Sequence, residues 1–341
     1  SMKSLNVNSN KLRYTHITPH FNTDIDINTN LIYCATFQIA WNSLQDNFFK
    51  EPLLLTGNPW DAEQLNKQEV TSNDIDSNSY VAIADTFNKE LIERINEELQ
   101  QKFGDNAPRM VYESQNVSEL AILSYCYLYK NLVFNKKFNK NNDPLSFYDS
   151  GKYLFIPSFG VDNSGLHNNQ AELAKQVDVL YYTNDDDFAL SLKSISVNDE
   201  LILAKTKPTK NLASTITLIN GKIDQSNITP MKDREILMIP YIDYDVEHSF
   251  KQFLNKLFLN DGWTGCYIDE AKQKIRFNLN ESGALLKSEA IIDIKSGTHT
   301  ISKKYREFVF NKPFLIMLRK KGSNLPYFAM WVGNTELLGK Y

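Results

Sequence analysis

The feature that most constrains this chain is the long stretch of residues 280–314, which lies between two strand-like segments near the C-terminus. It opens on Asn280-Glu281-Ser282-Gly283, directly after an alternating apolar segment at 274–279. It runs to about Tyr305 as a strand-like but unanchored segment, and it closes on Phe310-Asn311-Lys312-Pro313-Phe314. Unstructured connections longer than about 12–15 residues are uncommon in compact domains and are usually functional. The fold must therefore hold a long loop between a glycine hinge and a proline-anchored strand.

The rest of the chain has the composition of a globular protein, with 42% hydrophobic and 23% charged residues among 341. A chain of this length can bury a sizeable core, and no repeat or Pro/Gly-rich linker divides it. We expect the polar residues 1–30 to form a loosely held arm or an edge strand, and residues 31–341 to form one domain. The net charge of −4 does not indicate a nucleic-acid-binding protein, which would show a strongly basic domain or stripe. No apolar run approaches the ~20 residues of a membrane span. Three cysteines without a CxxC-type spacing indicate small buried side chains rather than a disulfide scaffold.

The first part of the chain favours helices. Residues 31–44 begin like a short strand and continue with helical spacing of apolar residues, which predicts a strand feeding a buried helix. Residues 60–68 predict another helix. The clearest helix is Lys89–Phe103, with Asn88 as its cap and Gly104 as its stop signal. Its apolar face is formed by Leu91, Ile92, Ile95, Leu99 and Phe103.

The later part favours strands. Residues 120–134, rich in Tyr, Leu and Ile, predict one long central strand. Asn220-Gly221 predicts a tight hairpin, and Pro240 indicates an edge or a bulge within its strand. An amphipathic helix is predicted at 246–259. Further strands are predicted at 153–156, 177–182, 188–195, 201–204, 215–219, 236–244, 274–279, 308–319 and 327–332. This order predicts an α+β fold with early helices and large mixed or antiparallel sheets.

The sequence offers no pattern for a catalytic centre, which would need converging nucleophilic or titratable groups. It contains no HExxH, GxSxG, GxxxxGK[ST] or GxGxxG motif. We therefore expect no enzyme, no catalytic residue, no cofactor and no resident metal.

Two charged clusters could bind an ion, but we expect both to be solvated loops. Carboxylates that could hold a hard cation, without EF-hand spacing, are Asp178, Asp185, Asp186, Asp187 and Asp199. Cations that could contact an anion are Lys136, Lys137 and Lys140.

Several segments occur in an order that resembles the serpin superfamily of serine protease inhibitors. Residues 274–290, with Glu281, Ser282 and Gly283, look like the serpin strand that leads into the hinge of the reactive-centre loop. Residues 310–319 and 327–332 resemble the paired C-terminal strands. Residues 234–254 resemble a strand followed by a helix with an aromatic face, and residues 120–138 resemble the long third strand of the main sheet. The resemblance covers about residues 80–335.

The chain departs from the serpin pattern where the family controls the opening of its sheet. Ala284 replaces a Thr in the hinge, Cys34-Ala35 replaces a Ser-Pro pair, and Ser124 replaces an Asn. Met330-Trp331 replaces a pair made of Gly and a basic residue. We expect residues 50–80 to lack a helix or strand that the family has.

The resemblance implies a protease inhibitor that works as a kinetic trap, in which a protease cleaves the exposed loop and the hinge inserts as an extra strand of the main sheet. Alternate residues would then face the core, and these are Ala284, Leu286, Ser288 and Ala290. Leu286 fits worst, because overpacking a formed core costs ~1–3 kcal/mol. Slow insertion would turn the inhibitor into a substrate. The hinge thus comprises Glu281, Ser282, Gly283, Ala284, Leu286, Ser288 and Ala290.

This interpretation does not fix the position of the scissile bond. Counting from Gly283 gives Gly297, and a loop longer than the family's leaves a region of candidates: Lys295, Ser296, Gly297, Thr298, Ser302, Lys303 and Lys304. A lysine there would suit a trypsin-like protease. The C-terminal anchor of the loop is formed by Phe310, Asn311, Pro313 and Phe314.

Three functions remain open at this point. The chain is a serpin-like inhibitor, a non-inhibitory serpin-like protein that binds a partner or small ligand, or an unrelated α+β binding protein whose residues 291–304 are a plain connector. A serine or cysteine protease is the partner that the first implies. We expect a monomer. An extracellular or secreted location is favoured over a cytoplasmic one, and the sequence decides neither.

Overall fold

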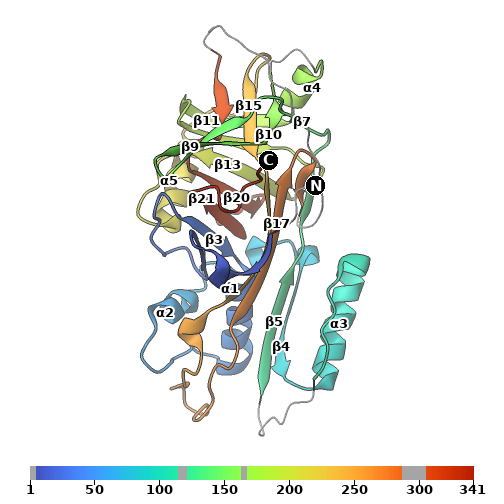
Figure 1. Ribbon diagram of the computed structural model, residues 1–341. Helices are drawn as coiled ribbons and strands as arrows, with labels where there is room; N and C mark the ends of the chain where they lie inside the picture. The colour runs from blue at the N-terminus through green and yellow to red at the C-terminus, as the bar shows by residue number, and fades with distance from the viewer. Residues whose placement is uncertain (1–4, 114–120, 163–166, 286–304) are drawn as a thin grey trace. The chain divides into compact units, whose positions relative to one another are not determined.

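The computed structural model describes residues 5–113, 121–162, 167–285 and 305–341 (Figure 1). The chain forms two compact units, each assembled from separate stretches. Unit 1 comprises Ser1–Tyr33, Asn131–His248 and Lys274–Tyr341, and unit 2 comprises Cys34–Lys130 and Ser249–Gln273. In the described ranges, no helix is both long enough and apolar enough to cross a bilayer. Helices and mixed sheets together confirm the predicted α+β class.

The largest sheet of unit 1 has eight strands. In their order across the sheet they are β14 (Thr229–Pro230), β11 (Val177–Asn184), β12 (Asp187–Leu192), β13 (Asp199–Lys205), β20 (Phe314–Lys320), β21 (Phe328–Val332), β3 (Asn30–Cys34) and β2 (Thr15–Thr18). All residues of β21 and β3 are buried, as near-continuous apolar strands require when both faces are covered. β20 pairs antiparallel with β13 and with β21, which places the last long strands of the chain in the middle of the sheet.

A second sheet of unit 1 has five strands. In order they are β1 (Leu5–Asn8), β16 (Ile242–Ser249), β17 (Lys272–Asn280), β18 (Gly283–Leu285) and β6 (Asn131–Val133). β1 pairs parallel with β16 at the sheet edge, so part of the predicted N-terminal arm is an edge strand.

The helix predicted at 246–259 is wrong. Val246 lies within β16, fully buried and opposite Val7 of β1, and the strand alternates buried and partly exposed residues as far as Val246. Pairing in the sheet thus outweighs the helical spacing of the apolar residues that follow. Only a 3₁₀ turn, Lys251–Phe253, remains of the predicted helix.

Two smaller sheets complete the strands of unit 1. One contains β19 (Glu307–Val309), β15 (Ile236–Pro240), β10 (Ser158–Val161) and β7 (Asn139–Lys140) in that order, and the other is the hairpin of β8 (Leu145–Asp149) and β9 (Lys152–Ile156). The strand predicted at 236–244 is divided after Pro240, and the one predicted at 308–319 is divided between β19 and β20.

Unit 1 also contains two helices, α4 (Gln170–Ala174) and α5 (Leu212–Asp224). The strand predicted at 215–219 and the hairpin predicted at Asn220-Gly221 are wrong, because both segments lie inside α5. Asn211 and Ser214 form a reciprocal capping box, which satisfies the free N–H groups of the first turn. The buried residues of α5 recur at helical spacing: Leu212, Thr215, Ile216 and Ile219.

Unit 2 is built on the antiparallel pair β4 (Tyr80–Thr86) and β5 (Ile122–Leu128) with helices α1 (Thr36–Leu44), α2 (Trp60–Asn66) and α3 (Lys89–Phe103). Alternation along β5 gives its two faces different neighbours. One face carries Leu123, Tyr125 and Tyr127, which pack with α3 and its buried residues Leu91, Ile95 and Leu99. On the other face the Ser124 hydroxyl donates to the Ala40 carbonyl of α1 at 2.6 Å.

α3 has the predicted bounds and cap. The Asn88 side chain accepts the Leu91 N–H at 2.8 Å, and Gly104 at the other end has a φ of 53°. The long strand predicted at 120–134 is interrupted, because β5 ends at Leu128 and β6 begins at Asn131.

Candidate functional site

The loop begins with a tight reversal of the chain at the end of β17. The Asn280 side-chain oxygen accepts the Ser282 N–H at 2.8 Å, and the Asn280 amide donates to the Asn278 side chain at 2.6 Å. Such an Asx turn reverses the backbone without further partners. Glu281 and Ser282 therefore form a turn, and Gly283 comes to lie opposite Asn280.

The residues after this turn form β18, which is paired on both sides. β18 is antiparallel to β17, with Asn278 opposite Leu285, and antiparallel to β6, with Gly283 opposite Val133. The turn is also held, since the Phe134 N–H donates to the Ser282 carbonyl at 3.0 Å and the Phe138 N–H to the Glu281 carbonyl at 2.8 Å. The prediction that the segment is unanchored from its start is therefore wrong for Gly283–Leu285.

Gly283 is required by the close approach of β6. A Cβ on Gly283 would lie 2.2 Å from the Leu132 carbonyl oxygen and 3.0 Å from the Val133 Cα. Its φ of 148° is also one that L side chains rarely adopt. Only glycine lets β18 fit between its two neighbours at this register.

The adjacent position faces the core. Ala284 is 2% exposed and lies opposite Leu132 and Leu279, which are 1% and 0% exposed. The other residues expected on the insertion face, Leu286, Ser288 and Ala290, lie outside the described residues, as does the whole scissile region: Lys295, Ser296, Gly297, Thr298, Ser302, Lys303 and Lys304.

Glu281 is a buried carboxylate at the base of the hinge, with 5% of the residue exposed. Lys140 of β7 lies 3.7 Å from it as an ion-pair partner. The Tyr241 hydroxyl lies beside it, and burial together with the Glu281 charge raises the pKa of Tyr241. A buried carboxylate needs such partners, because an uncompensated charge in the interior is costly. Lys140, one of the three lysines that could contact an anion, thus pairs with a carboxylate of the protein itself.

The other end of the loop is also buried. Arg306 donates to both carboxylate oxygens of Glu235, a residue 3% exposed, and its guanidinium lies over the Tyr182 and Phe308 rings. β19 follows and pairs parallel with β15. Two aromatic anchors, Phe310 and Phe314, are 0% exposed with ring centroids 4.9 Å apart.

Lys205 of β13 ties this exit to the β11–β12 turn. Its Nζ donates to the Val309 carbonyl at 2.9 Å, to the Asn311 side-chain oxygen at 2.7 Å and to the Asp185 carbonyl at 2.9 Å. The side chain is only 5% exposed, and burial lowers the pKa of Lys205 although Asp186, 3.2 Å away, opposes this. A buried ammonium with all three donors used is a structural tie.

The three aspartates of the β11–β12 turn each have a partner within the protein. Asp186 pairs with Lys312 at 3.1 Å, Asp187 pairs with Lys222 at 2.8 Å, and Asp185 accepts from the Tyr182 hydroxyl at 2.5 Å. Burial and this bond to Asp185 raise the pKa of Tyr182 to about 12. In the part of the chain that the structure describes, no group of His, Cys, Asp and Glu is arranged to hold a metal ion.

Gln273 of β17 holds the start of α1. Its amide donates to the Cys34 carbonyl at 2.8 Å and to the Thr36 hydroxyl at 2.9 Å. Burial raises the pKa of the Cys34 thiol. Sequence reasoning missed Gln273, Tyr241, Lys205 and Glu235, because their partners are distant in the sequence and no local pattern marks them.

Comparisons with known proteins give a consistent likeness in structure only. No protein-family model matches the chain, and a search of curated proteins finds no match. The solved structures that it resembles are serpins. Serpin48 from the insect Tenebrio molitor is 12% identical with a TM-score of 0.49, over 89% of this chain and 91% of that one.

Two other solved structures are matched over less of their length. Thyroxine-binding globulin in complex with thyroxine is 12% identical with a TM-score of 0.43, over 71% of this chain and 64% of that one. A serpin from Schistosoma mansoni is 15% identical with a TM-score of 0.40, over 72% and 64%. The chain thus spans 64% of the length of these two proteins.

Proposed function

We propose that this chain is a serpin-like protease inhibitor that acts through cleavage of its loop and insertion of the hinge into the five-stranded sheet. The observation that carries the proposal is the position of β18 between β17 and β6, paired with both. β18 covers only Asn278, Leu279 and Asn280, whereas β17 runs back to Lys272. Further residues of a cleaved loop can therefore add to the same side of β17.

The buried ends of the loop support the same mechanism. Glu281 with Lys140 fixes its start, and Lys205 with Asn311 fixes its exit. An intact loop held at both ends has less freedom to lengthen β18 than a cleaved one. Cleavage within the loop removes this restraint, and each newly paired residue then lowers the free energy of the sheet.

Limited proteolysis followed by thermal melting tests the proposal. We expect cleavage within 286–304 to raise the melting temperature, because the remaining residues 272–277 of β17 offer roughly six further pairs at about 1 kcal/mol each, which corresponds to about 8 °C in a chain of this size. Ser288→Arg should abolish this rise, because Ser288 is expected to face the core only once the hinge has inserted. Ser288→Ala, which stays small, should retain it. An unchanged melting temperature after cleavage of the wild type would contradict insertion of the hinge into the sheet.

A second experiment separates inhibition from insertion. Trypsin and a papain-like cysteine protease are incubated with the protein and analysed on denaturing gels for a covalent complex. A complex that survives denaturation supports the inhibitor. Cleavage with a rise in melting temperature but without a complex favours the alternative, a non-inhibitory serpin-like binding protein. The bulky Leu286 on the expected insertion face favours that alternative, because it would slow insertion.

A further inference from the structure

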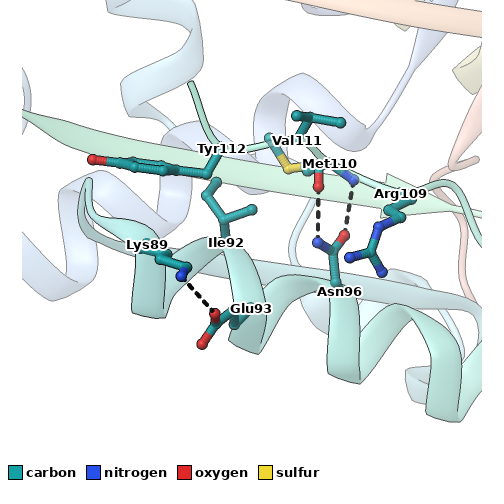
Figure 2. Close-up of a pocket in the computed structure, with 8 residues that line it drawn as sticks. All are labelled: Lys89, Ile92, Glu93, Asn96, Arg109, Met110, Val111 and Tyr112. Carbon is teal, nitrogen blue, oxygen red and sulfur yellow. Dashed lines mark hydrogen bonds and ion pairs between the residues drawn. The ribbon is translucent and has the colours of Figure 1, made fainter. Parts of the chain in front are cut away.

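A groove in unit 2, separate from the loop, lies between α3 and the segment that follows it. Figure 2 shows its walls, with Lys89, Ile92, Glu93 and Asn96 on the helix and Arg109, Met110, Val111 and Tyr112 opposite. Its volume is about 210 Å³. This is below the roughly 300–1,000 Å³ usual for drug-sized ligands, so the groove suits a small molecule of one or two rings.

The walls of the groove are fixed in place before any ligand binds. The Asn96 side chain donates to the Met110 carbonyl and accepts the Met110 N–H, both at 2.8 Å (Figure 2). Met110 also packs against the buried core of α3 and β4, and the Tyr112 ring lies 5.6 Å from that of Phe87. A preformed groove avoids the cost of ordering its walls on binding.

Two apolar side chains are exposed on the wall of the groove that follows α3. Ile92 is 3% exposed, but Val111 is 75% exposed and Tyr112 38%. Because these two side chains stay exposed, their apolar surface does not contribute to the stability of the fold. A flat apolar ligand would cover both of them.

The charges of the groove leave one cation available. Lys89 and Glu93 form an ion pair at 3.9 Å and balance each other (Figure 2). Arg109 is exposed and makes no hydrogen bond or ion pair within the described ranges. A guanidinium binds a carboxylate through two parallel N–H donors. Glu93 disfavours a second negative charge on the ligand.

We propose that this groove binds a small aromatic monocarboxylate, with its carboxylate on Arg109 and its ring over Ile92, Val111 and Tyr112. The Lys89–Glu93 pair closes the end of the groove at the start of α3. The site is independent of the loop and of its insertion. A dissociation constant on the order of 1 mM is expected for about a dozen non-hydrogen atoms.

Titration of the full chain with 2-naphthoate, followed by saturation-transfer NMR of the ligand, tests the site. Arg109→Gln should weaken binding at least ~5-fold. The matched control is Arg94→Gln, which removes a cation of α3 that does not line the groove and should leave binding unchanged. Glu93→Gln should tighten binding, because it removes the negative charge from the wall of the groove and leaves Lys89 without its partner.

Neutral 2-naphthalenemethanol serves as the second probe, because it keeps the rings and needs no folded variant. It should bind at least ~5-fold more weakly than 2-naphthoate. Equal binding of the two probes would mean an apolar surface without a carboxylate site and would overturn the proposal. So would the absence of 2-naphthoate binding at ten times the expected dissociation constant, or an equal effect of Arg109→Gln and Arg94→Gln.

Discussion

Gly283→Ala is the substitution whose effect the structure defines most sharply. The new Cβ would lie 2.2 Å from the Leu132 carbonyl oxygen and 3.1 Å from the carbonyl carbon. Neither atom can move alone, because both belong to the backbone of β6. β18 must therefore leave its place beside β6, or β6 must shift away from β18.

The cost follows from the pairing that is lost. β18 and β6 are in register over three residue pairs, which corresponds to two or three hydrogen bonds at ~0.5–1.5 kcal/mol each. Exposure of Ala284, now 2% exposed, adds a smaller apolar loss. We expect the free energy of unfolding to fall by about 2–4 kcal/mol.

Amide hydrogen exchange locates the effect, and urea denaturation measures its size. In Gly283→Ala, the amides of Leu132, Val133 and Ala284 should exchange faster, while those of β20 should not. The matched control is Gly322→Ala, because Gly322 has a φ of 86° but open space around its Cβ position. It should cost only the roughly 1 kcal/mol of backbone strain and leave exchange at β6 unchanged. Unaltered exchange in Gly283→Ala, with stability within ~0.5 kcal/mol of wild type, would refute the packing of β18 described above.

Three further predictions concern other parts of the fold. Lys205→Met should lower the free energy of unfolding in urea by about 3–5 kcal/mol, because three acceptors lose their donor. The control Lys222→Met, at a partly exposed ion pair, should lower it by ~1 kcal/mol or less. Equal effects of the two substitutions would contradict the role of Lys205 at the loop exit. Burial opposes ionisation of Asp186, but hydrogen bonds from Lys312 and Lys205 outweigh it and lower its pKa. Its contribution to stability is therefore present above the unfolded value of ~3.9 and is lost as the pH falls below it, and Asp186→Asn should flatten the stability profile measured between pH 5 and 2. Asn88→Ala should destabilise unit 2 by about 1 kcal/mol through loss of the α3 cap, and unchanged thermal unfolding would count against that role.

The elements predicted correctly are those whose signals are local. α3 carries its cap at Asn88, its apolar stripe and its stop at Gly104 within one stretch of sequence, so its prediction does not depend on residues elsewhere in the chain. The Glu281–Gly283 turn and the buried Phe310 and Phe314 also lie in segments with local patterns in the sequence, and their roles as hinge and anchor stay predictions.

The errors arose where pairing partners or competing signals decided the outcome. β-branched residues suggested a strand at 215–219, but the capping box at Asn211 and Ser214 starts a helix there, and that motif is readable in the sequence. β16 carries a local signal as well, because its alternation continues past the strand predicted at 236–244 as far as Val246, but its pairing with β1 joins segments that are distant in the sequence. The pairing of β18 depends in the same way on β6, and Lys205 gives no local sign that it holds Asn311.

The place of β20 and β21 in the eight-stranded sheet also has a consequence for synthesis on the ribosome. They emerge after all the other strands of this sheet, yet they lie between β13 and β3. Until residue 332 has left the exit tunnel, β13 and β3 each have an open, apolar edge that can pair with another nascent chain. Folding of unit 1 should therefore be slow, because its central contacts join distant parts of the chain. We expect the yield of soluble protein to depend on chaperone supply more than on the stability of the finished fold.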